Sequence, residues 1–477
     1  MNTENELQEA TGTRWQPATL IYAILTGGLI LSYLVTQAFD KPNYEYPAPI
    51  ALLRLIAAAM GIYLGKLWKD KGFWLMIAYL VYKAVRIAVK DPNLFFTNQV
   101  SDNLLNGLWV VAGCYALGRA LNIFQLKQFL RILATLWTAG TLIHCGLALH
   151  AAWIGQRIQN LSGKSIWGIG AADYRVTVGF YYPTASGSAI SISILVAACA
   201  LLAISGKLKK VYFFLSLLVM IITLGLTDAR TSFVSAAVGI GVATGCAELH
   251  LLYRDRQKKS TGNVKKKTVT LWTISFVSMA FVSIFFFLLF NEITPAFTRA
   301  RDHGGILFTV AEAEGSTQKQ GIANRRFIGW ESLSGRDVLW GNTIGYLTEH
   351  PKTFFFGDSI HNPMSGPNTR NGGEMGHCHN MVLQIILENG IIGLLFVILF
   401  AIYVVNHTVR LMFGEHVLLW ERVIPAIPVS VLVGDLAECF GWFRAWNSQA
   451  LVFLYLTVGI IVSLGNNEKV SRHIQAT

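Results

Sequence analysis

Apolar runs of about 20 residues recur along this chain, and a helix of that length spans the hydrocarbon core of a bilayer. The composition agrees: 53% of the residues are hydrophobic and 14% are charged, whereas soluble globular chains carry about a quarter charged residues. The first run begins near Pro17 and lacks a small-residue cleavage site, so we interpret it as a span and not as a signal peptide. The sequence therefore predicts an all-α polytopic membrane protein.

The runs predict about twelve membrane spans in three parts of the chain. Residues 1–290 hold about nine spans, residues 291–378 form a large external loop or cap, and residues 379–477 hold the last three and a tail. Because a loop of that length rarely lacks helices, we expect short helices in the cap, one of them over 337–349 with Pro351 as its stop. The expected spans are 17–38, 47–67, 72–90, 102–120, 129–153, 187–206, 210–227, 231–252, 269–290, 379–404, 417–436 and 447–464.

The net charge of +12 comes largely from basic residues in alternating short loops. These loops lie at 66–71, 207–210 and 254–267. Loops of this kind face the cytoplasm under the positive-inside rule, which places both termini inside and the segments 154–186 and 291–378 outside. We therefore interpret the charge as a sign of topology and expect no nucleic acid partner.

His379 and Asn380 stand where the large external loop enters an apolar run, and Gly390 and Gly393 follow within that run. On an unbroken helix Gly390 would lie three turns below His379 on the same face. A neutral imidazole accepts a proton from a hydroxyl group, and Asn380 either binds a sugar hydroxyl or caps the helix. The glycines either open a groove for a lipid tail or allow close helix packing. The layout suits an enzyme that acts on lipid-linked substrates; the alternative for His379 is a hydrogen bond to a loop carbonyl.

Three arginines fall on the external side under this topology. Arg230 opens an expected span, Arg336 lies in the large loop, and Arg175 lies in the other external segment. The guanidinium fork binds phosphate oxygens in pairs and stays charged, so the three together would suit a pyrophosphate. Snorkelling at a helix end is the alternative for Arg230.

Further charged residues fall inside the expected spans. Lys83, Arg86 and Lys90 recur at helical spacing, and this basic stripe, joined by Arg54, would bind acidic lipid phosphates. Snorkelling explains Lys90 better than the deeper Lys83. Glu388 is an intramembrane carboxylate, hence either a functional group or the partner of a neighbouring helix.

Motifs for cofactors are absent from the sequence. There is no Walker loop, no Rossmann glycine fingerprint and no paired-aspartate motif on an external loop. Cys378 is flanked by His377 and His379, and these three residue types are zinc ligands. Adjacent side chains on a helix point apart, however, which argues against a zinc site here. We expect neither a metal nor another cofactor.

The pattern around His379 resembles that of the O-antigen ligases. In that family a His is followed by Asn, Ser or Gln, nine residues, Gly, two residues, and Gly, Thr or Tyr, and this chain matches every fixed position with His379, Asn380, Gly390 and Gly393. The family's mid-chain arginine looks like Arg230, and the arginine of its large loop looks like Arg336. Alternatives for the second are Arg301, Arg325 and Arg326. The wider superfamily includes O-antigen polymerases and protein oligosaccharyltransferases.

The resemblance implies an enzyme of lipopolysaccharide biosynthesis in the bacterial inner membrane, with a GT-C-like architecture and an active site facing the periplasm. It would move O-polysaccharide from undecaprenyl pyrophosphate to a lipid A–core sugar hydroxyl, with inversion and without a metal. His379 would take the proton, and Arg230 and Arg336 would hold the pyrophosphate. The stripe of Lys83 and Arg86 favours a lipid A acceptor over the polymerase reaction. The alternative from another class, a lipid-linked glycan transporter, predicts repeat symmetry that the sequence lacks.

Overall fold

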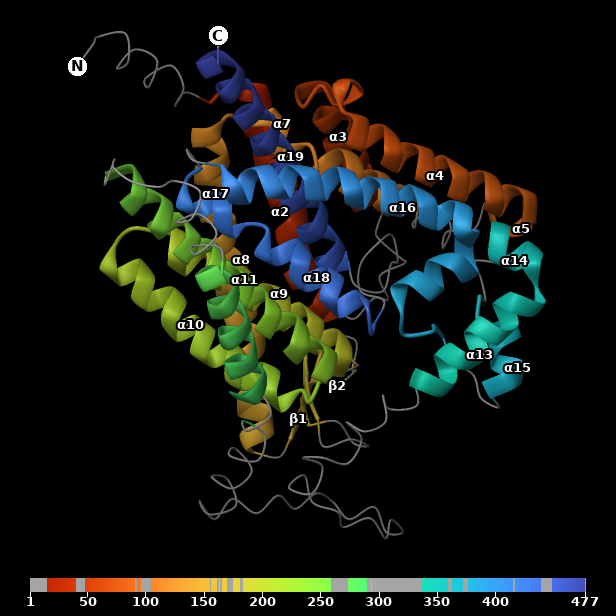
Figure 1. Cartoon of the computed structure of the whole chain (residues 1–477). Coiled ribbons are helices and arrows are strands. Elements are labelled where there is room, and N and C mark those ends of the chain that lie inside the picture. The colour runs from red at the N-terminus through yellow and green to blue at the C-terminus, as the bar shows by residue number, and fades with distance from the viewer. Residues whose placement is uncertain are drawn as a thin grey trace.

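The computed structural model describes most of the chain, and its secondary structure there is mainly helical (Figure 1). The description covers residues 15–39, 48–90, 92–95, 104–154, 156–160, 163, 165–169, 175–180, 183–258, 273–289, 293, 336–358, 363–371, 376–414, 417–438 and 448–476.

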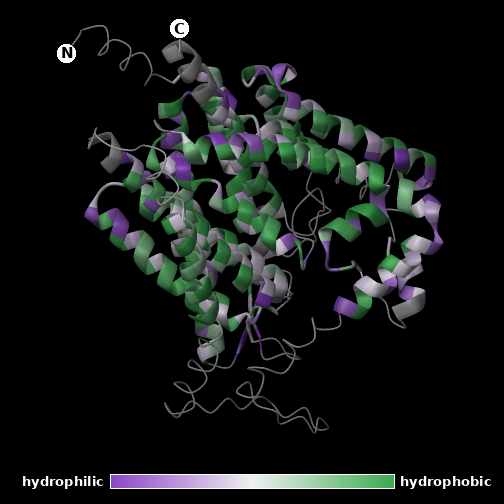
Figure 2. Cartoon of the chain, in the orientation of Figure 1, coloured by the Kyte–Doolittle hydropathy of each residue, from purple (hydrophilic) through white to green (hydrophobic). Residues whose placement is uncertain are grey.

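Eight helices within these ranges are long and apolar enough to cross a membrane, and Figure 2 shows them as mostly hydrophobic ribbons. The prediction of a multi-pass membrane protein is therefore confirmed, whereas the expected count of about twelve spans is not. Two more apolar helices, α3 (Ala48–Leu64) and Thr273–Leu289, are shorter. The eight are α2 (Pro17–Phe39), α4 (Lys71–Lys90), α8 (Ile123–Trp153), α9 (Pro183–Ala203), α10 (Lys207–Leu226), α11 (Arg230–Lys258), α16 (Met381–Phe413) and α19 (Ser448–Ala476).

The two remaining expected spans are interrupted. The run at 102–120 contains the π-helix η2 (Trp109–Cys114) and the short α7 (Leu117–Ala120). The run at 417–436 is divided into α17 (Leu419–Val423) and α18 (Ala426–Asp435). Pro425 lies at that division, and proline both lacks the amide hydrogen and collides with the preceding turn of a helix.

A small antiparallel sheet lies within residues 154–186 and is an exception to the mainly helical fold of the described residues. Its order is β1 (Arg157–Gln159), β2 (Ser165–Ile169) and β3 (Val176–Val178). β-Branched residues dominate β3, whose three side chains are all buried, and such residues pack well on a pleated surface. Trp167 of β2 donates its indole N–H to His144 Nδ1 of α8 at 3.2 Å. The sheet is thereby fixed at the C-terminal end of α8.

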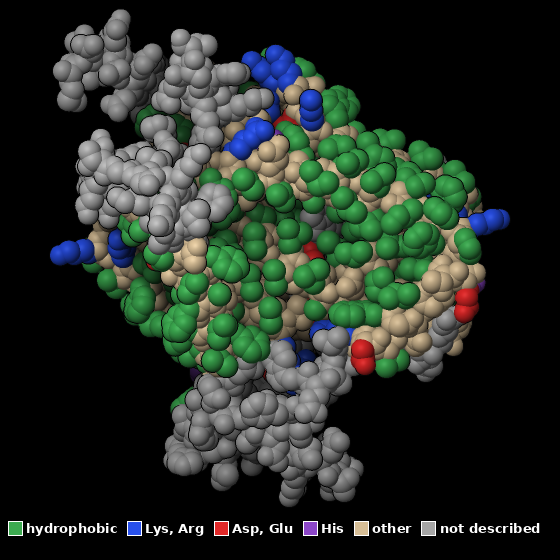
Figure 3. All heavy atoms as spheres, viewed as in Figure 1, with side chains coloured by type: hydrophobic (Ala, Val, Ile, Leu, Met, Phe, Trp, Pro, Cys, Tyr) green, Lys and Arg blue, Asp and Glu red, His purple; other side chains and the backbone are tan. Residues whose placement is uncertain are grey.

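The helices divide into central and peripheral ones. The apolar stretches of α9 and α19 are 83% and 89% buried, whereas those of α4 and α10 are 39% and 44% buried. The outward faces of the peripheral helices form the broad hydrophobic surface in Figure 3, with basic side chains gathered at the top of the view. Because no water-soluble fold exposes apolar patches of this extent, the surface is the one that lipid covers.

Short helices occupy the described end of the second external segment, as expected. They are α13 (Arg336–Glu349), α14 (Pro351–Phe356) and α15 (Ser365–Asn371). The predicted helix over 337–349 is confirmed and begins one residue earlier. Pro351 opens α14 as its first residue, a position where its missing amide hydrogen costs no helical hydrogen bond. Two minor helices, η1 (Leu67–Lys69) and α5 (Pro92–Phe95), flank α4.

Candidate active site

Asn380 fixes the entry of the chain into α16. Its side-chain oxygen accepts a hydrogen bond from the Leu383 amide at 3.1 Å, which makes it the N-cap of the helix. Its side-chain nitrogen donates to the Leu436 carbonyl at 2.9 Å, just beyond α18. The sequence allowed Asn380 either to bind a sugar hydroxyl or to cap the helix, and the geometry shows the cap. Asn380 thus joins α16 to the end of α18 directly beside His379.

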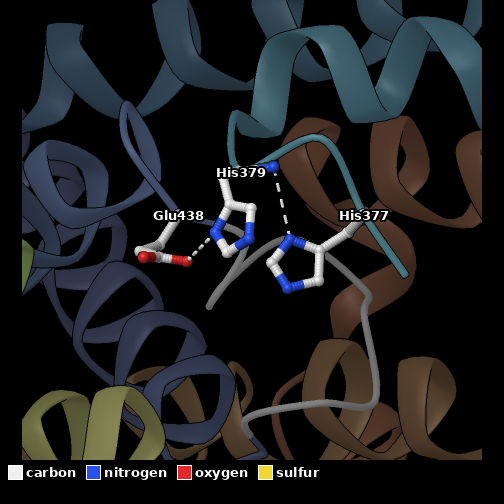
Figure 4. Close-up of side chains that lie close together, drawn as sticks. All are labelled: His377, His379 and Glu438. Carbon is white, nitrogen blue, oxygen red and sulfur yellow. Dashed lines mark hydrogen bonds and ion pairs between the residues drawn. The ribbon is translucent and has the colours of Figure 1, made fainter. Parts of the chain in front are cut away.

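His379 lies against a buried carboxylate. Its Nδ1 is 2.7 Å from Glu438 Oε2, and the side chains of His379 and Glu438 are 27% and 2% exposed (Figure 4). A carboxylate only accepts hydrogen bonds, so Nδ1 is the donor and the lone pair of a neutral ring lies on Nε2. A base oriented by a third group in this way is the usual arrangement around a proton-accepting histidine.

His379 also has a strained backbone, with a φ of 49°. Non-glycine residues rarely adopt this left-handed conformation, and it costs about 1–3 kcal/mol. Cys378, one residue earlier, is held on both sides of its backbone. Its carbonyl accepts a hydrogen bond from the Trp340 indole at 2.9 Å, and the Cys378 amide donates to the side chain of Gln384 at 3.0 Å. These contacts hold the loop in the conformation that directs the imidazole towards Glu438.

Arg336 pairs with the second oxygen of the same carboxylate. Its Nη2 contacts Glu438 Oε1, and the Arg336 side chain is 20% exposed at the start of α13. The structure therefore brings Arg336 and His379 together through Glu438, for which the sequence predicts only pairing with the nearby Asp435 and Arg444. The guanidinium compensates the buried negative charge, which would be costly without a partner.

Arg175 and Arg230 form a second basic cluster. Arg175 Nε lies 3.5 Å from Asp228 Oδ2, and Arg230 is the first residue of α11 two positions later. Asp228 is left-handed, with a φ of 47°, so the turn before α11 is strained like the turn before α16. The ion pair thus places Arg175 beside the turn that precedes Arg230.

The two clusters lie at the same end of the bundle. α11 and α18 pack against each other, and Ser235 and Ser430 each donate a side-chain hydrogen bond to the other's carbonyl at 2.8 Å. Arg230 precedes Ser235 by five residues, and Asp435 follows Ser430 by five residues, which is about 7.5 Å of helix in each case. The two helices run in opposite directions at this contact. Arg230 and the end of α18 therefore lie at about the same distance from it, on the same side along the helix axes.

Gly390 does not open a groove below His379, which corrects that expectation. The helix breaks at this residue, whose φ of 68° and ψ of −179° suit glycine almost alone. A Cβ there would overlap the Phe355 carbonyl, so the backbone of α14 fills the notch. Gly393 follows the break, and a Cβ on it would meet the Asn389 side chain of its own helix. The break, not a lipid tail, explains Gly390.

The basic stripe on α4 holds this break through contacts within the protein. Arg86 donates to the carbonyl of Glu388 and, at 2.9 Å, to the carbonyl of Asp358, while Lys90 pairs with the Asp358 carboxylate at 2.8 Å. Lys83 is 4% exposed, so it does not present its charge at the surface. Arg54 is equally buried and donates to the Tyr33 hydroxyl at 2.8 Å. The prediction of a lipid-phosphate stripe is therefore corrected.

Glu388 and Asp358 complete the network at the break. Glu388 Oε1 accepts from the Gln384 side chain at 2.8 Å within α16. Asp358 donates its amide hydrogen to the Leu387 carbonyl at 2.6 Å and accepts from the Tyr346 hydroxyl at 3.0 Å. Burial raises the pKa of Tyr346, and the hydrogen bond and charge of Asp358 raise it further, so the hydroxyl stays a donor.

Among the described residues, the side chains that could hold a metal ion are His377, His379 and Glu438, whose ligand atoms lie within 4.8 Å of one another. Cys378 is buried, and its thiol contacts the Asn380 carbonyl at 3.2 Å, so it does not join the two histidines as a zinc ligand. The Arg336 guanidinium already occupies Glu438 and disfavours a second cation on that carboxylate. The expectation of a metal-free site stays a prediction.

Comparison with known families supports the resemblance. Residues 215–398 match the family model described as O-antigen ligase. This central region of the chain is similar to the O-antigen ligase family. The matched region contains Arg230, Arg336, His379 and Asn380 together with both glycines, whereas Arg175 and Glu438 lie outside it. No curated protein matches the chain.

Proposed function

We propose that this protein is an O-antigen ligase that transfers O-polysaccharide from undecaprenyl pyrophosphate to a sugar hydroxyl of lipid A–core. The match of residues 215–398 to the O-antigen ligase family supports the reaction class, glycan transfer in a membrane. The observation that carries the chemistry is the contact between His379 Nδ1 and the buried Glu438 carboxylate. The ligase reaction is favoured over polymerisation by the family description.

The first part of the proposed step concerns the acceptor. Its hydroxyl approaches His379 Nε2, and its oxygen forms the new bond to the anomeric carbon while the proton moves to the ring. The imidazolium that results carries a positive charge beside Glu438, whose carboxylate stabilises it and holds its orientation.

The second part concerns the leaving group. The bond from the anomeric carbon to the pyrophosphate oxygen breaks, and its electron pair leaves with the pyrophosphate. Arg336 uses one nitrogen on Glu438, and a guanidinium has five N–H donors, so others can reach the phosphate oxygens. Arg230 and Arg175 add positive charge at the same end of the bundle, where it offsets the charge that develops. A single displacement of this kind inverts the anomeric configuration.

The polymerase reaction uses the same donor and a second lipid-linked glycan as acceptor. The basic stripe on α4 does not distinguish the ligase reaction from the polymerase reaction, because Arg86 and Lys90 have partners within the protein. Complementation of a ligase-deficient strain separates them: a ligase restores capped lipopolysaccharide, whereas a polymerase lengthens the lipid-linked chain only. A transporter of lipid-linked glycan would yield neither product in a purified assay.

The decisive experiment is transfer in vitro with purified protein, lipid-linked donor and lipid A–core, in the presence of a chelator. We expect His379→Gln to lower the transfer rate by about 10²–10⁴-fold, the usual contribution of a general base. His350→Gln is the matched control, because His350 is an exposed histidine of the same external segment. Near-normal transfer by His379→Gln would exclude His379 as the base. Loss of wild-type transfer on chelation would instead favour a metal at His377, His379 and Glu438.

A further inference from the structure

A cavity of ≈ 160 Å³ lies between α8, α9, α17, α18 and α19, far from the candidate active site. It is lined by the first turns of α8 and the last turns of α9. The small sheet and the Arg175–Asp228 pair lie at the other ends of these two helices. The cavity therefore belongs to the opposite end of the bundle, which the positive-inside pattern assigns to the cytoplasmic leaflet.

The cavity has an apolar interior built at helical spacing. Three of the contributing helices, α8, α9 and α19, present positions i, i+3, i+4 and i+7, among them Cys199 on α9 and Phe453 on α19. Most of the lining side chains are aliphatic or aromatic. Enclosed apolar cavities of similar volume bind hydrocarbon ligands in other proteins. The interior therefore fits part of an acyl chain.

The lining also includes three polar groups that suit the other end of a lipid. Lys127 and Arg131 are exposed and lie one turn apart on α8. Trp420 in the first turn of α17 is 8% exposed, and its indole N–H has no hydrogen-bond partner among the described residues. A buried donor without an acceptor is costly, so an acceptor supplied by a ligand would stabilise it.

We propose that this cavity binds an anionic phospholipid of the leaflet at this end of the protein. Its acyl chain enters the apolar interior, its phosphate lies between Lys127 and Arg131, and an ester carbonyl accepts the hydrogen bond of the Trp420 indole. Charge complementarity selects the occupant, because two cations beside an apolar cavity fit a negatively charged headgroup better than a zwitterionic one. The site is separate from the proposed transfer reaction and does not depend on it.

Native mass spectrometry of the delipidated full-length protein tests this proposal. The protein is titrated with phosphatidylglycerol and with phosphatidylethanolamine of identical acyl chains. We expect Lys127→Gln with Arg131→Gln to weaken phosphatidylglycerol binding by about thirty-fold, since each basic residue contributes about 1 kcal/mol to such binding. The matched control is Lys207→Gln with Lys210→Gln, an exposed basic pair on α10 outside the cavity lining.

A second variant tests the interior. Ala200 is 8% exposed and lines the cavity, so Ala200→Phe should fill the space and abolish retention of either lipid. Unfolding temperatures close to that of the wild type confirm that each variant folds. If Ala200→Phe unfolds at a clearly lower temperature, the comparison of the two double glutamine variants tests the proposal without it. Equal loss of affinity in both glutamine pairs, or equal binding of the two lipids by the wild type, overturns the proposal. Displacement of phosphatidylglycerol by glycerol phosphate alone also overturns it, because an anion site without a lipid chain would then explain the binding.

Discussion

One buried carboxylate organises the chemistry of the candidate site. Glu438 gives one oxygen to His379 and the other to Arg336, so a single side chain links the expected base to one of the expected phosphate ligands. With 2% exposure it has little water to replace either partner. The proton-accepting nitrogen and the guanidinium are thereby held in a fixed relation before any substrate binds, which lowers the cost of arranging them during the reaction.

Glu438→Gln tests this role. The amide keeps the shape but loses the negative charge, so it neither fixes the tautomer of His379 nor stabilises the imidazolium, and we expect transfer to slow by about 100-fold. Steady-state kinetics should show the loss in kcat with little change in KM for the donor. Asp337→Asn, an exposed acidic residue beside Arg336, is the control. Equal rates for the wild type and Glu438→Gln would remove Glu438 from the mechanism.

Arg230→Lys separates a guanidinium fork from a simple positive charge. Lysine keeps the charge at the start of α11 but cannot bind two phosphate oxygens in one plane. We expect transfer to fall by about 10–100-fold, the cost of one or two charged hydrogen bonds. The measurement is the rate with the lipid-linked donor at saturating acceptor. A rate equal to that of the wild type would contradict paired binding of the pyrophosphate by Arg230.

The sequence predicted part of this site and could not predict the rest. His379, Asn380, Arg230 and Arg336 follow from a local pattern and from the sides on which their loops fall. Glu438 lies 59 residues beyond His379, and only tertiary packing brings it into contact. Asp435 lies three residues before it, and charged residues so close in the sequence favoured pairing among themselves over a contact with His379.

At the scale of the elements, the sequence predicted the apolar span of α16 but not the break in its helix at Gly390. Apolar residues continue through Gly390, and their spacing predicted an unbroken helix with a groove below His379. The break depends on contacts from distant segments: the Tyr82 hydroxyl donates to the Asn389 carbonyl at 2.9 Å, and the α14 backbone packs against Gly390. Hydrophobic periodicity reports which face is buried and carries no information about such contacts.

Gly390→Ala should disrupt this junction. The methyl group would overlap the Phe355 carbonyl, and alanine disfavours the positive φ, so we expect a loss of about 2–4 kcal/mol in stability. Thermal unfolding in detergent should show a clearly lower midpoint. Gly146→Ala on α8 is the matched control, because a Cβ there meets nothing within 4 Å. Equal midpoints for the two variants would mean that the break does not depend on Gly390.

At the scale of the whole molecule, the candidate site and the basic loop between α9 and α10 lie at opposite ends. His379, Arg336 and the Arg175–Asp228 pair lie where the external segments pack, and the basic loop between α9 and α10 lies at the other end. Composition was enough to predict a multi-pass helical protein. The number of spans was not predictable in the same way, since proline and a π-helix interrupt two predominantly apolar runs and two other apolar helices are shorter than expected.

Cysteine labelling tests that division in intact spheroplasts. α10 has 20 residues and rises about 30 Å, so Lys207 and the turn before Arg230 lie a membrane thickness apart. We expect a membrane-impermeant maleimide to label His350→Cys at once and Lys207→Cys only after permeabilisation, because the positive-inside rule predicts that the first residue faces the periplasm and the second the cytoplasm. The five described native cysteines are buried, and the unsubstituted chain measures the background. Labelling of Lys207→Cys in intact spheroplasts would place the candidate site in the cytoplasm, where a glycan on the periplasmic leaflet cannot reach it.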